Sequence, residues 1–298
     1  MAILGFELCV RFLWGSLIIL AFISRKETSE RFLKVASYIL LGFGVCAGVF
    51  LYWSFESAKI PTGLSPNPFL AHHGIQSVTS KLITLGSLVI GGMLYSRTYS
   101  RFGRIAGFLL FLLSPMFLFV DQNFSYFFNF TLSSLLLGSV FGGQYLGHWY
   151  LNVPGMHISE LKRVIQILQI VVLSKSLEIV WSLWQWSNSL TSNIDPMGRP
   201  LGLNLSSTQS LLKINFENSD FAVAGSAWLG FGIFGIILML GRILWGLIAP
   251  LILSYMVKKT VDIRSTQSAT GILYALSVSV LFGEACALYL FYQLGIFL

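Results

Sequence analysis

The sequence predicts an all-α protein, a polytopic transmembrane helix bundle of about eight spans with the N- and C-termini on the outward (non-cytoplasmic) side. Three observations predict this class. Hydrophobic residues make up 55% of the chain and charged residues only 10%, whereas an ordinary soluble domain carries roughly 25% charged residues. The apolar residues fall into runs about as long as a bilayer is thick. The basic residues collect in alternate loops between these runs, a pattern typical of membrane topology.

The apolar runs predict the individual spans. A helix rises 1.5 Å per residue, so roughly 20 apolar residues cross the hydrocarbon layer. We expect spans at 3–23, 33–54, 80–96, 105–121, 124–147, 163–185, within 221–257 and at 270–293. The first run carries charged residues and lacks a small-residue cleavage site, so a retained span is expected rather than a signal peptide. For 221–257 we expect one span plus an interfacial or re-entrant extension, with a kink or break at Pro250.

Loop charges predict the orientation. If the N-terminus faces outward, the inward loops hold most of the basic residues, namely Arg25, Lys26, Arg31, Lys34, Arg97, Arg101, Arg104, Lys162, Arg163, Lys258, Lys259 and Arg264. The outward side then holds Lys59, Lys81, Arg199 and Lys213. Two spans within 221–257 would place Lys258, Lys259 and Arg264 on the outward side, so a single span is favoured there.

The chain is expected to form a single transmembrane domain over residues 1–298, with outward loops at 55–79 and 187–220 and no soluble domain. The basic residues are scattered between spans, which argues against a nucleic-acid partner. Cys9, Cys46 and Cys286 lie inside apolar runs without CxxC spacing, which argues against disulfides and zinc. The expected partners are the lipid bilayer, other membrane subunits and a soluble partner on the outward face. The expected location is the cell (inner) membrane, as a multi-pass protein.

Charged residues inside the spans form the first candidate site. Six remain once the loops are assigned: Glu7, Arg11, Lys175, Glu178, Arg242 and Glu284. The helical rise places most of them roughly 10–15 Å below the outward surface, and Arg242 joins them if its span begins near Gly235. A charge at membrane depth costs roughly 2.5–3.5 kcal/mol. Three acids and three bases at one level therefore predict mutual pairing.

Two interpretations of these charges stay open. Glu7 and Arg11 are spaced i, i+4, and Lys175 and Glu178 are spaced i, i+3, so each pair can close within its own helix and serve assembly alone. The functional alternative is a polar cavity, open to the outward side, for protons, a small ion or a polar headgroup. Glu284 has no partner on its own helix, and we expect it to be the residue that changes protonation.

A second candidate site lies at the inward end of the fifth span. The segment 142–157 combines small residues with His148, Tyr145 and Trp149, and Asn152 to Gly155 predict the end of the helix. His148 could ligate a haem iron or bind a quinone carbonyl. The remaining histidines are His157 in the same loop and His72 and His73 on the opposite face, so a two-histidine haem site is not expected. A haem with a Met ligand stays open, as does a histidine satisfied by headgroups.

The sequence contains no HExxH, GxSxG, P-loop or paired-Asp motif, so no catalytic or metal-binding residue is assigned. We therefore expect a non-enzymatic component for transport of protons or a solute, or a subunit of a larger membrane complex of the respiratory or energy-converting kind. One alternative is a redox protein that binds haem or quinone near His148. The other is a membrane enzyme that acts on lipid headgroups.

Overall fold

The computed structural model describes residues 2–23, 30–59, 77–97, 101–115, 124–153, 158–192 and 232–294. Over these residues the chain is helical and contains no strand, which confirms the predicted all-α class. Five of the helices are long and apolar enough to cross a membrane: Ala2–Phe22, Arg31–Ser54, Ser159–Gln185, Gly235–Asp262 and Thr266–Phe291. The number of eight spans and the side on which the termini lie stay predictions.

The described helices follow the predicted order. They are α1 (Ala2–Phe22), α2 (Glu30–Lys59), α4 (Ser77–Arg97), α5 (Arg101–Leu113), α6 (Phe124–Asn152), α7 (Ser159–Ser192), α9 (Gly232–Ile243), the π-helical turn η3 (Leu244–Ile248), α10 (Ala249–Asp262) and α11 (Thr266–Leu294). Because α9, η3 and α10 continue into one another, the described residues form eight helices in all.

Several helices extend beyond the predicted spans. Helices α2 and α7 continue to residues 59 and 192, but their apolar parts end at Ser54 and Gln185 as predicted, so the ends of the two outward loops include helical residues. The span predicted at 124–147 continues as helix to Asn152, whereas the helix within 105–121 ends at Leu113. The apolar run marks the part of a helix that lipid can cover, and helices such as α7 continue in polar residues beyond it. The prolines and histidines at 61–73, the turn at 193–198 and His157 lie outside the described residues.

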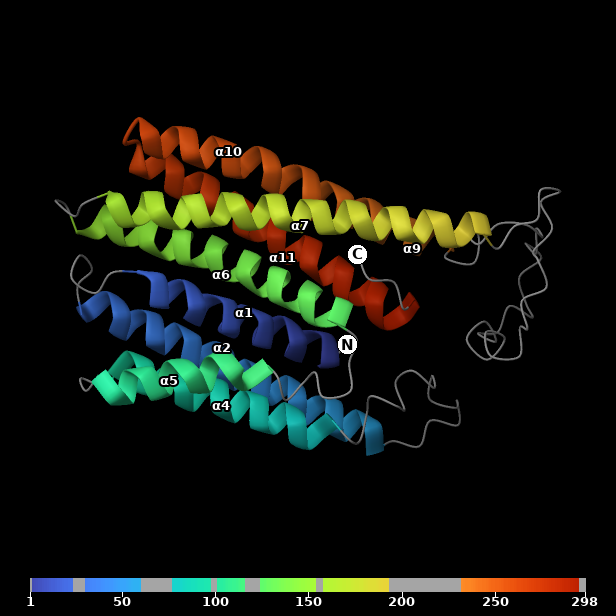
Figure 1. Cartoon of the computed structure of the whole chain (residues 1–298), viewed down its shortest axis with the longest axis horizontal. Helices are drawn as coiled ribbons and strands as arrows, with labels where there is room; N and C mark the ends of the chain where they lie inside the picture. Colours follow the sequence, from blue (N-terminus) through green and yellow to red (C-terminus); the bar gives the residue numbers. More distant parts are fainter. Residues whose placement is uncertain are drawn as a thin grey trace.

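Consecutive helices run antiparallel (Figure 1). We name the two ends of the bundle after residues: α1 begins and α11 finishes at the Ala2 end, and α10 finishes at the Asp262 end. Helices α1, α2, α4 and α5 form one half of the bundle, and α6, α7, α9 to α10 and α11 form the other. The contact between α1 and α6 joins the halves, with further contacts between α1 and α11.

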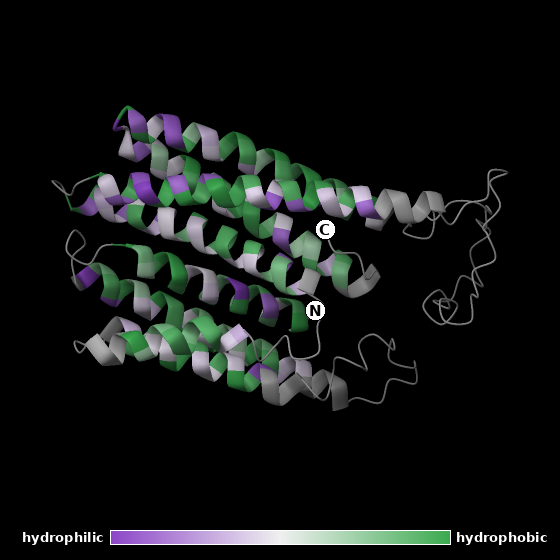
Figure 2. Ribbon diagram, viewed as in Figure 1, coloured by the Kyte–Doolittle hydropathy of each residue, from purple (hydrophilic) through white to green (hydrophobic). Residues whose placement is uncertain are grey.

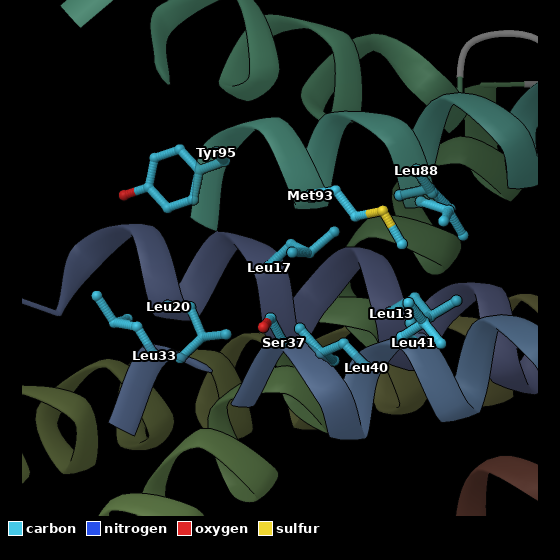
Figure 3. Close-up of a pocket in the computed structure, with 12 residues that line it drawn as sticks. Leu13, Leu17, Leu20, Leu33, Ser37, Leu40, Leu41, Leu88, Met93 and Tyr95 are labelled. Atoms are coloured by element: carbon cyan, nitrogen blue, oxygen red, sulfur yellow. The ribbon is translucent and has the colours of Figure 1, made fainter. Parts of the chain in front are cut away.

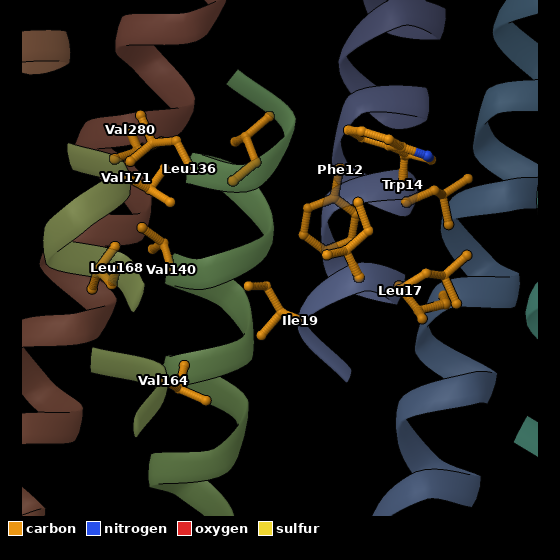
Figure 4. Close-up of a cluster of buried hydrophobic side chains, with 14 of the residues drawn as sticks. Phe12, Trp14, Leu17, Ile19, Leu136, Val140, Val164, Leu168, Val171 and Val280 are labelled. Atoms are coloured by element: carbon orange, nitrogen blue, oxygen red, sulfur yellow. The ribbon is translucent and has the colours of Figure 1, made fainter. Parts of the chain in front are cut away.

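The hydrophobic core is continuous across this junction. Figure 4 shows Ile19 between α1 and α6, and on the other side of α6 it shows Leu136 and Val140 beside Leu168 and Val171 of α7. The backbones of α1 and α6 approach closely where Gly15 meets Gly138, because a Cβ atom on either glycine would overlap the backbone of the other helix. Small residues permit this approach between membrane helices. The junction lies one turn from Arg11 on α1, and the close packing brings Arg11 within reach of the polar residues of α6.

Pro250 does not break its helix, so of the two expected effects, a kink or a break, the break is wrong. Helix runs on both sides of it, and the preceding turn is widened to the π form, in which the Ala249 N–H bonds to the Leu244 carbonyl. In that register the Trp245 carbonyl would accept from residue 250, which has no N–H because it is proline. The Ser279 hydroxyl on α11 donates to this carbonyl instead, at 2.8 Å. A neighbouring side chain thus satisfies the group that proline leaves open.

The exterior is apolar along its length and basic at one end. Figure 2 shows hydrophobic residues over most of the helices, with hydrophilic residues gathered at the Asp262 end of several of them. Exposed side chains in mid-helix include Val45 and Val49 on α2 and Ile170 and Leu177 on α7. Charged residues at the Asp262 end include Lys162, which lies 3.7 Å from Asp262. This exterior suits lipid rather than water.

Candidate functional site

The six charged residues predicted inside the spans lie together in the structure. They come from four helices: Glu7 and Arg11 from α1, Lys175 and Glu178 from α7, Arg242 from α9, and Glu284 from α11. No side chain among them is more than 9% exposed. We call these six residues the charge network.

Glu284 lies at the centre of the charge network. Its Oε1 accepts a hydrogen bond from Arg242 Nη1 at 2.9 Å. Its Oε2 lies 3.7 Å from Arg11 Nη1. Lys175 is close enough to interact electrostatically with the same carboxylate. One acid on α11 is therefore surrounded by bases from three other helices.

The α1 part of the network adds a tyrosine. Arg11 Nη2 bonds to Glu7 Oε2 at 3.5 Å, the i, i+4 pair expected from the spacing. The Tyr126 hydroxyl on α6 donates to Glu7 Oε1 at 2.5 Å. The Arg11 guanidinium also lies over the Phe130 ring, 5.4 Å from its centroid. Arg11 thus pairs both within its own helix and across to α11, and these contacts do not decide between assembly alone and a polar cavity.

Asn129 connects the α1 and α7 parts of the network. Its Oδ1 accepts from Arg11 Nη1 at 3.4 Å, and its Nδ2 donates to Glu178 Oε1 at 2.7 Å. Glu178 Oε2 in turn lies 2.7 Å from Lys175 Nζ, the expected i, i+3 pair. The amide of Asn129 therefore has a donor group facing an acid and an acceptor group facing a base. The contacts extend without interruption from Tyr126 to Lys175.

Sequence reasoning missed three residues of this site. Tyr126 and Asn129 are uncharged and occur in an apolar run, and Lys81 was counted among the basic residues of the outward side. In the structure Lys81 lies on α4, is 8% exposed and interacts electrostatically with Glu7. A polar face of α6 could have been predicted from sequence spacing. Polar residues recur at i, i+3 and i+7 along it, as Tyr126, Asn129 and Ser133.

With Lys81 included, the buried groups hold more positive than negative charge. Three acids face four bases: Arg11, Lys175, Arg242 and Lys81. Two further nitrogens of Arg242, Nε and Nη2, have no hydrogen-bond partner among the described residues. The site as described can therefore accept additional negative charge or hydrogen-bond acceptors.

Close helix packing holds Arg242 in place. A Cβ atom on Gly246, one turn further along, would lie 2.8 Å from Arg242 Nη1, so the guanidinium rests on this glycine. A Cβ atom on Gly283, next to Glu284, would lie 2.5 Å from the Gly246 Cα. The α9 and η3 backbones therefore approach α11 at the position of the ion pair. A side chain at Gly283 would force the two helices apart, and one at Gly246 would displace the Arg242 guanidinium.

The second candidate site is a cavity beside His148. His148 lies on α6 and is exposed, while Tyr145 and Trp149 pack on Phe32 of α2 with ring centroids 4.8 and 5.7 Å apart. The cavity has a volume of about 330 Å³ and is lined by α1, α2, α6 and Tyr274 of α11. Among the described residues, its lining contains Tyr145 and His148 but neither methionine nor a second histidine, so these residues do not fit a haem with two protein ligands.

Among the residues that the structure describes, no three His, Cys, Asp or Glu side chains come together as a metal site. The described cysteines are free, with Cys9 and Cys286 buried and Cys46 exposed. The fold is that of a helical membrane protein, since five of the described helices are long and apolar enough to cross a bilayer. Comparison of the chain with protein-family models, curated proteins and solved structures finds no match.

Proposed function

We propose that this protein is a non-enzymatic membrane component that handles protons through the charge network. The observation that carries the proposal is the position of the Glu284 carboxylate between Arg242 of α9 at 2.9 Å and Arg11 of α1 at 3.7 Å. Each oxygen faces a different helix. Movement of one helix then breaks one ion pair and leaves the other intact.

Proton uptake follows from the depth of these groups. A carboxylate in a low dielectric binds a proton more readily once one of its cationic neighbours moves away. Separation of Arg242 from Glu284 would therefore favour protonation of Glu284, and return of Arg242 would release the proton. The π-helical turn η3 begins two residues after Arg242, and such turns are frequent at functional sites and hinges. Helix movement and proton binding would thus be coupled.

Proton flux into liposomes tests this proposal. The purified full-length protein is reconstituted with a pH-sensitive dye inside, and a potassium diffusion potential is applied with valinomycin. We expect the wild type to acidify the interior faster than in protein-free liposomes. Glu284→Gln removes the titrating group with little change in shape, and we expect its flux to fall to the protein-free rate.

Glu160→Gln is the matched control. Glu160 is fully buried and pairs with Arg163 at 2.7 Å, but it lies in the first turn of α7 at the Asp262 end, away from the charge network. We expect wild-type flux from this variant. A wild-type flux no greater than that of protein-free liposomes would mean that the ion pairs serve assembly alone, as would equal fluxes from Glu284→Gln and the wild type.

The other predicted roles have separate support and separate tests. Membership in a larger complex, of respiratory type or otherwise, is tested by identifying the proteins that co-purify in a mild detergent. The redox alternative is supported by the cavity beside His148, although the lining does not suit haem. For an enzyme acting on lipid headgroups we find no supporting arrangement of described side chains beyond the charge network itself. Placement in the inner membrane with both termini outward rests on the loop charges.

A further inference from the structure

We infer that the cavity between α1, α2 and α6 binds a neutral, lipid-soluble molecule with a hydroxylated ring, of the isoprenoid quinol class. This inference concerns a different site from the charge network and does not depend on proton handling there. It rests on the distribution of polar and apolar groups in the lining, on two buried polar atoms without partners, and on the opening of the cavity.

The cavity is polar at one end and aromatic at the other. Ser16, Gln144 and His148 lie roughly 6–12 Å from the Asp262 ends of their helices, counted at 1.5 Å per residue. Phe12 and Phe43 lie deeper, and their rings are 4.1 Å apart. An occupant with a polar ring near the bilayer surface and an apolar part towards the centre matches this order.

Two polar atoms in the lining lack partners. Ser16 is 6% exposed, and its Oγ has no hydrogen-bond partner among the described residues. The Oε1 of Gln144 is likewise buried and unpartnered. An unmade hydrogen bond in such surroundings is costly, roughly 1–3 kcal/mol per group. Both atoms are covered by protein atoms in this structure, so the Ser16 or Gln144 side chain has to turn towards the cavity before it meets a ligand. After that turn a quinol hydroxyl can donate to Gln144 Oε1, and a ligand oxygen can accept from the Ser16 hydroxyl.

The charge of the lining argues for a neutral ligand. The described lining contains no Lys, Arg, Asp or Glu, so it has no group suited to a phosphate or carboxylate headgroup. Ile39 on α2 and Tyr274 on α11 line the cavity and are 42% and 46% exposed. An apolar chain attached to the ring can leave between such residues into the lipid. The volume, about 330 Å³, lies at the low end of ligand pockets, which suits a ring with the start of its chain.

A second hollow on the other side of α1 provides the comparison. It measures about 40 Å³ and is lined by leucines of α1 and α2, with Met93 and Tyr95 of α4 and with Ser37 (Figure 3). The Ser37 hydroxyl already donates to the Lys34 carbonyl at 2.7 Å. This hollow is too small for a ring and offers no unpartnered hydroxyl, so it serves as an internal control.

Titration with a short-chain quinol tests the inference. The full-length protein in nanodiscs is titrated anaerobically with ubiquinol-1 and, separately, with ubiquinone-1, and binding is followed by tryptophan fluorescence, since Trp149 lies one turn from Tyr145. We expect saturable binding with the quinol tighter. Ser16→Ala and Gln144→Leu should each weaken quinol binding roughly tenfold, the value of one buried hydrogen bond.

Controls separate binding from folding. Ser37→Ala makes the same change as Ser16→Ala at the small hollow, and we expect unchanged affinity. Ala36→Phe fills the cavity from α2 and should abolish binding, and thermal unfolding of each variant shows whether it is folded. The assignment would be overturned by binding that does not saturate or by equal affinity for quinone and quinol. It would also be overturned if Ser37→Ala weakened binding as much as Ser16→Ala, or if phosphatidylglycerol displaced the quinol. The flux assay on Glu284→Gln is unaffected by either result.

Discussion

Removal of the Lys175 side-chain charge tests whether buried ion pairs stabilise this bundle. Lys175 is 1% exposed, and its Nζ lies 2.7 Å from Glu178 Oε2. Lys175→Met keeps most of the side-chain volume and leaves Glu178 as an acid without its cation. Removal of one partner from a buried pair typically costs about 3–5 kcal/mol. We expect the lower value, about 3 kcal/mol, because Asn129 still donates to Glu178 at 2.7 Å.

Unfolding with SDS in mixed micelles, followed by tryptophan fluorescence, gives the free energy of unfolding. Lys162→Met is the matched control, since Lys162 lies 3.7 Å from Asp262 and both side chains are 40% exposed or more. We expect that variant to lose less than about 1 kcal/mol, as exposed pairs do. The double variant Lys175→Met with Glu178→Gln should recover most of the loss, because no charge is then left alone.

Two results would refute this reasoning. Equal losses from Lys175→Met and Lys162→Met would show that burial adds nothing to the pair. A double variant as unstable as Lys175→Met would show that the loss comes from packing rather than from the isolated Glu178 charge.

Two further predictions concern the backbone. Gly15→Ala should lower the free energy of unfolding by more than about 3 kcal/mol, because its Cβ atom would overlap the Ser134 carbonyl. Gly42→Ala is the control and should be neutral or stabilising, because no atom lies within 4 Å of the added Cβ. Equal SDS midpoints for the two variants would contradict the close approach of α1 and α6. Arg264 has φ 61° at the end of α10, a conformation that costs a non-glycine residue about 1 kcal/mol, so Arg264→Gly should raise the stability by that amount, and a lower stability would contradict it.

Burial cost explains which parts of the site the sequence could predict. A charge in an apolar run requires a partner, so Arg11 and Glu284 could be expected to meet although they lie on helices at opposite ends of the chain. Asn129 gives no such signal, because an uncharged amide is far less costly in a span than an ion. Its role as a connector depends on the rotation of α6 relative to α1 and α7. That rotation is set by the Gly15 to Gly138 contact, which hydropathy cannot show.

Local sequence patterns likewise predicted one part of the fold and missed another. Apolar runs predicted every described helix, but helix ends extend past the lipid-covered part, as at Ser192 and Lys59. Pro250 was expected to kink or break its helix because a proline removes one hydrogen bond. The widened turn and the Ser279 hydroxyl on another helix compensate for that loss. Compensation by a distant residue is a tertiary effect that local sequence patterns do not contain.

The long helix from α9 to α10 differs from α1 in its surroundings, since 17% of its apolar window is buried against 72% for α1. In a bilayer most of its surface would be available to acyl chains, whose length and order vary with membrane composition. A thicker or stiffer bilayer would act on this helix before it acts on the enclosed ones, through the tilt that best matches hydrophobic thickness. Because Arg242 belongs to the same helix, lipid composition would alter the distance between Arg242 and Glu284.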